Sequence, residues 1–223
     1  MPDYHLEAMS QAKNYQRSIL SLITRHLPME AVPVLDYGAG HGDYAIQMVN
    51  AGYRVEVYEP DASAHPWLQS RGLLRVDHLT PGQYAAIYSL NVFEHIAEDA
   101  VAMADGHAAL KPAGLLLVYV PAHAEIWTAM DDAVGHQRRY TRDSLQALFQ
   151  GAGFEVLASG EHDFAGYWVG RLLARHPERP VSVSARNVWL FDRLVFPCGG
   201  PIGKLHKQAR GKNVWVLGRK QGV

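Results

Sequence analysis

Apolar residues recur at helical spacing in some segments of this chain and form short unbroken runs in others. Residues 5–26 carry apolar side chains near helical spacing, and Pro28 ends the predicted helix. Short apolar runs and helical patterns then alternate. The runs predict strands at 32–36, 53–59, 73–76, 85–90 and 115–120, and the helical patterns predict helices at 44–51, 62–70 and 98–110. This alternation predicts a parallel sheet covered by helices on both faces.

The last part of the chain departs from this alternation. Thr141 is a good N-cap for a helix at 142–151, and two final strands are predicted at 154–158 and 214–218. The roughly fifty residues between these strands form a connection that is long enough to be functional or separately structured. We predict one domain in four parts, namely an N-terminal helix (1–28), a core (29–160), an insertion that we interpret as a lid (161–213), and a last strand with its tail (214–223).

The insertion is rich in aromatic and aliphatic side chains. These are Trp168, Leu172, Leu173, Trp189, Leu190, Phe191, Leu194 and Phe196. Such a set is consistent with a cover over a lipid-like acceptor, a peripheral membrane contact, a homodimer contact or a small satellite core. The sequence alone leaves these uses open.

Composition narrows the class of protein. The formal charge of −1 and the pI near 6.9 give no reason to expect a nucleic-acid partner, although the chain from Lys204 onward holds basic residues and no acidic ones. A single cysteine, Cys198, excludes an internal disulfide and favours a reducing compartment. The N-terminus lacks the pattern of a signal peptide, and no apolar run approaches the ~20 residues of a membrane span. We expect a cytoplasmic protein.

A glycine-rich turn follows the first predicted strand. Asp36 ends that strand, and Gly38, Gly40 and Gly42 allow the backbone to approach a nucleotide-like ligand. The dinucleotide fingerprint would place its third glycine where this chain has Asp43, and the nearby acids would repel a pyrophosphate. An NAD-dependent oxidoreductase is therefore disfavoured. S-adenosylmethionine fits better because it has no phosphates and carries a positive amino group and sulfonium.

Polar side chains follow the next three strands. Glu59 lies nineteen residues beyond Gly40, near the ~20-residue spacing at which an acid meets ribose hydroxyls. Asp77 follows the third strand, where it is expected at the adenine edge, and Asn91 follows the fourth, beside the methionine moiety. The alternative for Asp77 and Asn91 is a local role in capping turns and satisfying backbone groups.

Several sequence blocks together carry a resemblance to a known family. They are Asn-Tyr-Gln-Arg at 14–17, the strand and glycine turn at 34–42, Tyr-Ser-Leu-Asn-Val-Phe-Glu-His-Ile at 88–96, Leu-Lys-Pro-Ala-Gly at 110–114, Val-Pro-Ala at 120–122 and Gly-His-Gln-Arg-Arg-Tyr at 135–140. The chain resembles class I S-adenosylmethionine-dependent methyltransferases of the ubiquinone-methyltransferase-like group. Within that group it is similar to a bacterial subfamily sometimes fused to glycosyltransferases that resemble polyprenyl-phosphate sugar synthases.

The resemblance implies a Rossmann-like, seven-stranded, mostly parallel sheet, S-adenosylmethionine as cofactor, and a small-molecule or lipid-linked glycan acceptor. The residues expected at the cofactor are Tyr15, Arg17, Asp36, Gly38, Ala39, Gly40, Glu59, Pro60, Asp77, Asn91 and Val92. The chain departs from the family pattern at Ala85, usually Asp, and at Ala113, usually Gly. Neither residue is expected to touch the cofactor.

Methyl transfer to a hydroxyl needs a base. His41, His95 and His136 all lie in loops predicted at the ligand edge of the sheet, and histidine titrates near neutral pH. We predict His136 as the base and His95 as the second candidate. Arg138 and Arg139 carry planar forks that suit a phosphate or carboxylate on the acceptor.

We place Tyr140 in the same catalytic group. The alternative is that His136 and Tyr140 only position the following helix, while Arg138 and Arg139 pair with Asp131 or Asp132.

The Glu94-His95 pair resembles part of a Glu-x-x-Glu-His cluster with which some related methyltransferases hold a divalent metal. The first glutamate of that cluster is Asn91 here, and the sequence shows no third anionic ligand. We therefore predict no metal. Two other functions stay open, a quinone-type O-methyltransferase and a catalytically silent domain that binds the cofactor and acts as a partner protein.

Overall fold

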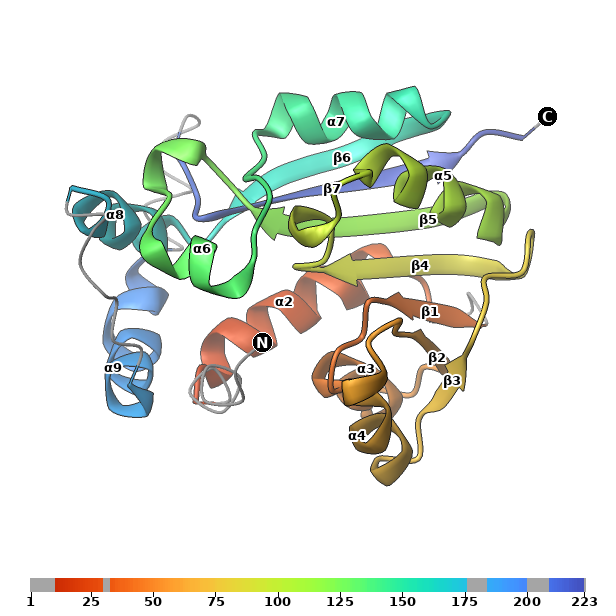
Figure 1. The fold of residues 1–223 in the computed structure, drawn as a ribbon, viewed down its shortest axis with the longest axis horizontal. Coiled ribbons are helices and arrows are strands. Elements are labelled where there is room, and N and C mark those ends of the chain that lie inside the picture. Colours follow the sequence, from red (N-terminus) through yellow and green to blue (C-terminus); the bar gives the residue numbers. More distant parts are fainter. Residues whose placement is uncertain (1–10, 30–32, 176–183, 200–208, 223) are drawn as a thin grey trace.

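The computed structural model describes residues 11–29, 33–175, 184–199 and 209–222, and a seven-stranded sheet runs through it (Figure 1). The strands are β1 (Val34–Tyr37), β2 (Val55–Tyr58), β3 (Leu74–Val76), β4 (Tyr84–Leu90), β5 (Leu110–Pro121), β6 (Phe154–His162) and β7 (Asn213–Lys220). Their order across the sheet is β3-β2-β1-β4-β5-β7-β6.

The first five strands pair in parallel, and β7 runs antiparallel between β5 and β6. This arrangement confirms the predicted sheet. The chain moves outward from β1 to β3 and then returns to place β4 on the other side of β1. Such a reversal leaves a crevice beyond the carboxyl ends of β1 and β4, where open α/β sheets bind their ligands.

Helices cover both faces of the sheet. They are α2 (Lys13–His26), α3 (Asp43–Asn50), α4 (His65–Ser70), α5 (Asp99–Ala109), α6 (Ala129–Val134), α7 (Arg142–Gly151), α8 (Phe164–Leu173) and α9 (Ala185–Leu190). Short turns of other helix types are η1 (Ala62–Ala64), η2 (Phe93–His95), η3 (Ala124–Ile126) and η4 (Phe191–Val195).

The central strand β5 shows why the helices split into two layers. Side chains alternate across a strand, and Leu116 and Val118 join a core cluster with α5 and α7, whereas Leu117 and Tyr119 join a second cluster with α2, α3 and α4. All four side chains are buried. The continuous apolar run of β5 is therefore explained by burial on both faces, as expected for a strand in a covered sheet.

The structure differs from the predicted elements in several details. Residues 111–114, which separate the predicted helix at 98–110 from the predicted strand at 115–120, lie inside β5, where the register with β4 jumps from Tyr84 opposite Leu110 to Ala86 opposite Leu115. A bulge thus replaces a break, and Ala113 has a left-handed φ of 61° within it. The helix predicted at 62–70 divides into η1 and α4. Residues 5–10 of the predicted first helix lie outside the described residues.

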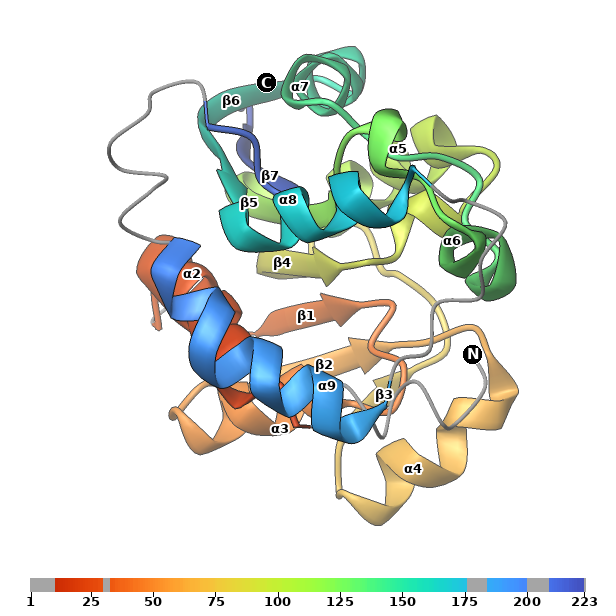
Figure 2. The same cartoon turned by 90° about the vertical axis from the view of Figure 1, so that its left-hand side faces the viewer.

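The predicted insertion forms helices at one end of the sheet. It begins after β6 and ends before β7, and in Figure 2 both α8 and α9 lie in the foreground, with α9 beside α2. Asp192 fixes that contact, because its buried carboxylate accepts hydrogen bonds from the backbone N–H groups of Asn14 (2.9 Å) and Tyr15 (2.8 Å). An acid at the N-terminus of α2 also complements the helix dipole.

Within the described residues, every helix is too short or too polar to cross a membrane.

Candidate functional site

The glycine turn predicted to hold the cofactor lies between β1 and α3. Gly40 has a φ of 53°. A Cβ atom added to Gly40 would meet no heavy atom within 4 Å beyond those of its two chain neighbours, so a ligand can approach the backbone there. Gly38 is closed by a neighbour instead, because its Cβ would lie 2.4 Å from a methyl group of Val92. The turn therefore presents one accessible stretch of backbone around Ala39 and Gly40.

Glu59 lies against this stretch. Its Oε2 accepts a hydrogen bond from the Gly40 N–H (2.7 Å) and its Oε1 accepts one from the Asp61 N–H (2.8 Å), just after Pro60. The side chain is almost fully buried. The acid predicted for the ribose and the glycine turn are thus neighbours, which is the arrangement that the spacing of Gly40 and Glu59 predicts.

Two further predicted cofactor residues flank the turn. Asp36 is buried at the end of β1, and burial, together with the charge of Glu59, raises its pKa to about 7. A cationic ligand group beside these acids would lower that pKa and relieve the cost of their burial. Asn91 follows β4 with a left-handed φ of 53°. The acids and the open backbone fit S-adenosylmethionine, whose amino group and sulfonium are positive.

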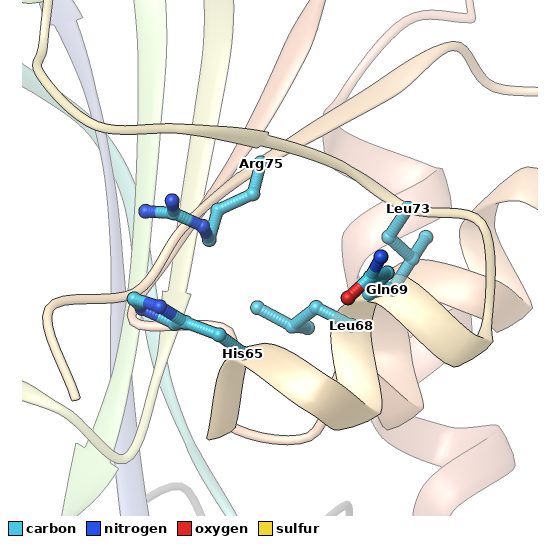
Figure 3. A pocket seen from close by; sticks show the side chains of 5 residues that line it. All are labelled: His65, Leu68, Gln69, Leu73 and Arg75. Carbon is cyan, nitrogen blue, oxygen red and sulfur yellow. The ribbon is translucent and has the colours of Figure 1, made fainter. Parts of the chain in front are cut away.

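Asp77 lies just beyond β3, where its exposed carboxylate pairs with Arg75 at 2.6 Å. Arg75 also lines a pocket of about 280 Å³ between α4 and β3. Figure 3 shows Arg75 and His65 on one side of that pocket and Leu73 on the other, with the Leu68 side chain between them. His65 connects the pocket to the glycine turn, since its Nε2 lies 2.9 Å from the Glu59 carbonyl oxygen.

A larger cavity of about 510 Å³ lies beyond the carboxyl ends of β4 and β5. Its polar lining includes Tyr15, Asn91, Glu94, Asp131, His136, Arg139 and Asp163. Its apolar lining comes chiefly from η3, α6, α8, α9 and η4, and includes Ile126, Met130, Val134, Val169, Leu173, Val188 and Phe191. The cavity adjoins the predicted methionine end of the cofactor site through Asn91, so it is the candidate acceptor site.

His136 projects into this cavity with a fixed orientation. Asp131 Oδ1 lies 2.8 Å from His136 Nδ1, and the carboxylate also accepts hydrogen bonds from Arg139 Nε (2.7 Å), Arg139 Nη2 (3.1 Å) and the Thr128 N–H (2.9 Å). Burial alone would raise the pKa of Asp131, but the hydrogen bonds from His136 and Arg139 outweigh it and hold the pKa well below its usual range. A charged Asp131 only accepts, so Nδ1 carries the proton and Nε2 of the neutral ring is left as an acceptor.

Glu94 faces His136 from η2. Its side chain is fully buried, neither carboxyl oxygen has a hydrogen-bond partner within the described part of the chain, and Oε1 lies 3.9 Å from His136 Nε2. Burial raises the pKa of Glu94 to about 8. This raised pKa favours the neutral carboxylic acid at pH 7.

His95 packs edge-on against His136, with ring centroids 4.8 Å apart, and burial lowers its pKa. Glu94, His95 and His136 each place one potential ligand atom within 4.8 Å of the others. The fold thus brings in from a distant segment a third candidate ligand that the sequence pattern did not reveal. That the site uses no metal stays a prediction.

The remaining predicted catalytic residues are engaged elsewhere. Arg138 Nη1 pairs with Asp99 (2.6 Å), and its Nη2 donates to the Ala97 carbonyl (2.7 Å). Arg139 pairs with Asp131, as described above. Neither arginine therefore offers a free guanidinium to an acceptor anion, and the structure favours the alternative in which they pair with acids.

The side chain of Tyr140 is also engaged within the protein. It is buried, and its hydroxyl lies 2.7 Å from Asp99 Oδ2, to which it donates, and 3.1 Å from the Phe93 carbonyl oxygen, which ties the loop before α7 to the start of α5. It does not line either described pocket.

The two cofactor residues predicted on the first helix, Tyr15 and Arg17, lie in different environments. Tyr15 lines the large cavity, and its hydroxyl lies 3.0 Å from that of Tyr119 and 3.3 Å from Asn213 Oδ1. Arg17 is exposed and donates to Asn14 Oδ1 at 3.2 Å. Of the pair, only Tyr15 is in a position to meet a cofactor or an acceptor in this conformation.

From the sequence, Asp131 was expected only as an alternative partner for Arg138 or Arg139, and its role in orienting His136 was not predicted. The signal was present in the sequence, because Thr128-x-x-Asp131 forms a capping box at the start of α6 and Asp131 stands five residues before His136. A capping box normally indicates only a helix start. Here the same carboxylate caps the helix, orients a histidine and pairs with an arginine.

The comparisons with known proteins agree with this geometry. A family model described as a methyltransferase domain matches residues 11–159, which is more than half of the chain. No curated protein sequence matches the chain.

Solved structures share the fold at low sequence identity. An S-adenosylmethionine-dependent methyltransferase from Thermotoga maritima has a TM-score of 0.67 and 15% identity over 98% of this chain and 95% of its own. A methyltransferase in complex with the Trm112 activator from Haloferax volcanii has a TM-score of 0.64 and 12% identity over 99% and 96%. An N1-methyltransferase from Burkholderia thailandensis with bound 1,6-didemethyltoxoflavin and S-adenosylhomocysteine has a TM-score of 0.58 and 18% identity over 93% and 79%.

Proposed function

This chain belongs to the methyltransferase domain family and uses S-adenosylmethionine, and we propose that it methylates a hydroxyl group on a small-molecule or lipid-linked glycan acceptor. The observation that carries this proposal is the His136–Asp131 pair in the cavity beside Asn91. The pair leaves His136 Nε2 free to accept a proton, which is the group that a hydroxyl acceptor requires.

The bound cofactor supplies an electrophilic methyl group on a sulfonium. The protein's part is to hold the acceptor in line with that methyl and to take up its proton. His136 Nε2 would accept the proton of the acceptor hydroxyl as the methyl group leaves the sulfonium sulfur, which becomes a neutral thioether, and Asp131 would stabilise the resulting imidazolium. Arg139 holds Asp131 in place at two oxygens, so that the base keeps one orientation.

The cavity lining supports an acceptor with a sizeable apolar part. The seven apolar side chains named above come chiefly from α6 and the insertion helices. A lipid tail attached to a glycan would fill such a space. Because burial removes apolar surface from water, acceptor binding gains about 25 cal/mol per Å² covered.

A quinone-type acceptor is the second candidate. An uncharged aromatic acceptor would have no evident use for Arg138 and Arg139. The structure gives both arginines a use within the protein, with Asp99 and Asp131. The apolar cavity therefore suits a prenylated phenol as well as a lipid-linked sugar.

Turnover by wild type and by His136→Ala tests the proposal, with a panel of polyprenyl-linked sugars, free sugars and prenylated phenols. We expect His136→Ala to bind the cofactor nearly as wild type does and to lose on the order of 10²-fold in turnover. His107→Ala, on α5, is the matched control and should retain its turnover. An unchanged rate in His136→Ala on every accepted substrate would retire His136 as the base.

A further inference from the structure

The two insertion helices each present one exposed stripe of the same composition. Each stripe has one Trp, one Leu and two Arg at positions i, i+3, i+4 and i+7, which share one face of a helix. On α8 the stripe is Trp168, Arg171, Leu172 and Arg175, the last just beyond the helix end; on α9 and η4 it is Arg186, Trp189, Leu190 and Arg193. We call these eight residues the outer stripes.

The outer stripes expose large apolar side chains to an unusual degree. Trp168 is 64% exposed, Leu172 60%, Trp189 46% and Leu190 37%. Among the described residues, eight of the fourteen exposed large hydrophobic side chains belong to α8, α9 and η4, and two of these eight, Val169 and Leu173, line the large cavity. Exposed apolar area concentrated in this way marks an interaction surface, because single scattered residues would be ordinary.

The segment that carries the outer stripes has a large excess of basic over acidic residues. Residues 164–212 contain nine Lys and Arg but two acids, although the whole chain carries −1. One of the two acids, Asp192, is buried against α2. The four stripe arginines are exposed and form no ion pair with an acid in the described parts of the chain, and Arg193 lies 5.7 Å from the Trp189 ring centroid.

We propose that the outer stripes dock on the surface of an anionic phospholipid bilayer. Tryptophan and leucine side chains enter the boundary between headgroups and acyl chains, while arginines keep their apolar stems on that boundary and their guanidinium groups at the lipid phosphates. A second copy of this chain is a poorer partner, because symmetric pairing would bring the same arginines together.

Because the inner faces of the same helices line the large cavity, a membrane contact on their outer faces bears on access to that cavity. Val169 and Leu173 of α8, and Val188 and Phe191 after them, line the large cavity. Figure 2 shows α8 and α9 on one side of the molecule, so docking through their outer faces puts the cavity wall at the bilayer surface. An acceptor anchored in the bilayer then has a short path into the site. The membrane contact itself does not depend on the proposed chemistry.

Vesicle flotation tests the proposal on the full-length protein without cofactor or acceptor. We expect wild type to float with phosphatidylglycerol–phosphatidylcholine vesicles, to bind phosphatidylcholine alone much more weakly, and to dissociate in about 1 M NaCl, where the Debye length falls to about 3 Å. Trp fluorescence should shift to the blue on binding. Absence of wild-type binding to the anionic vesicles would overturn the proposal.

Paired variants locate the contact. Arg171→Gln with Arg175→Gln should lower the binding constant by roughly 25-fold, since one basic residue near an anionic surface is worth about 5-fold. Trp168→Ser with Leu172→Ser should lower it by at least about 10-fold. Controls of matched type are Trp67→Ser with Leu74→Ser, which are 50% and 58% exposed on α4 and β3, and exposed Arg54→Gln.

Equal losses in the stripe and control variants would contradict the assignment. Stripe variants could instead change the mass of the protein in analytical ultracentrifugation and leave vesicle binding the same. That result would also contradict the assignment, because the face would then join two copies of the chain. Circular dichroism confirms that each variant folds.

Discussion

Glu94→Gln tests the electrostatics at the centre of the site. Glu94 is buried without a hydrogen-bond partner in the described structure, and burial raises its pKa from 4.5 to about 8. The charges around it are Arg139, which lowers the pKa, and Asp131, which raises it. His136 and His95 are its other titratable neighbours. The substitution keeps the shape of the side chain and removes its titration.

The sign of the effect follows from proton binding. Between about pH 4.5 and pH 8 the folded protein keeps the Glu94 proton while the unfolded chain releases it, so the folded state loses stability as the pH rises. The loss is at most about 1.4 kcal/mol per pH unit. From about pH 5 to pH 7.5 it amounts to about 3 kcal/mol. The free energy of unfolding of Glu94→Gln should escape this loss.

Urea unfolding of wild type and Glu94→Gln at several pH values, with a chelator present, measures the difference. We expect the variant to gain on wild type by about 3 kcal/mol across that pH range, while other groups titrate alike in both proteins. Glu98→Gln, which replaces an exposed glutamate just before α5, is the matched control. A constant difference in Glu94→Gln would refute the raised pKa.

Two further predictions concern the groups around His136. Asp131→Asn should lower the free energy of unfolding by about 3–5 kcal/mol, because it leaves the buried Arg139 guanidinium without a charged partner, and it should slow turnover without weakening cofactor binding. Asp132→Asn is the control, since an amide oxygen can still accept the hydrogen bond from Trp127. Equal effects in both variants would contradict the positioning role. Dialysis against EDTA should leave turnover unchanged if the site uses no metal. Loss of turnover that Zn²⁺ or Mn²⁺ restores would instead assign a metal to Glu94, His95 and His136.

The sheet could be predicted from the sequence because its strands are apolar runs punctuated by turn residues. Buried strands such as β5 need apolar side chains on both faces, and this need is visible without a structure. The bulge at 111–114 could not be predicted from the sequence, because Pro112, Ala113 and Gly114 are also typical of a turn between separate elements. Local propensity therefore indicated a break where pairing with β4 continues.

The cofactor residues were predictable for a related reason. Gly40 and Glu59 lie at the ends of neighbouring parallel strands, so their contact follows from the strand order alone. The residues on the acceptor side of the site were harder to predict from the sequence. The roles of Arg138 and Arg139 depend on which acids the fold brings to them, and Asp99 and Asp131 come from α5 and α6, whose packing no local pattern specifies.

The central claim is that the glycine turn and Glu59 bind S-adenosylmethionine, and calorimetric titration tests it most directly. Wild type should bind S-adenosylmethionine and S-adenosylhomocysteine, Glu59→Ala should lose that binding, and Glu155→Ala, a surface acid paired with Arg219, should bind as wild type does. Folded wild type that binds neither compound, or Glu59→Ala that binds both as tightly as wild type, would contradict the account.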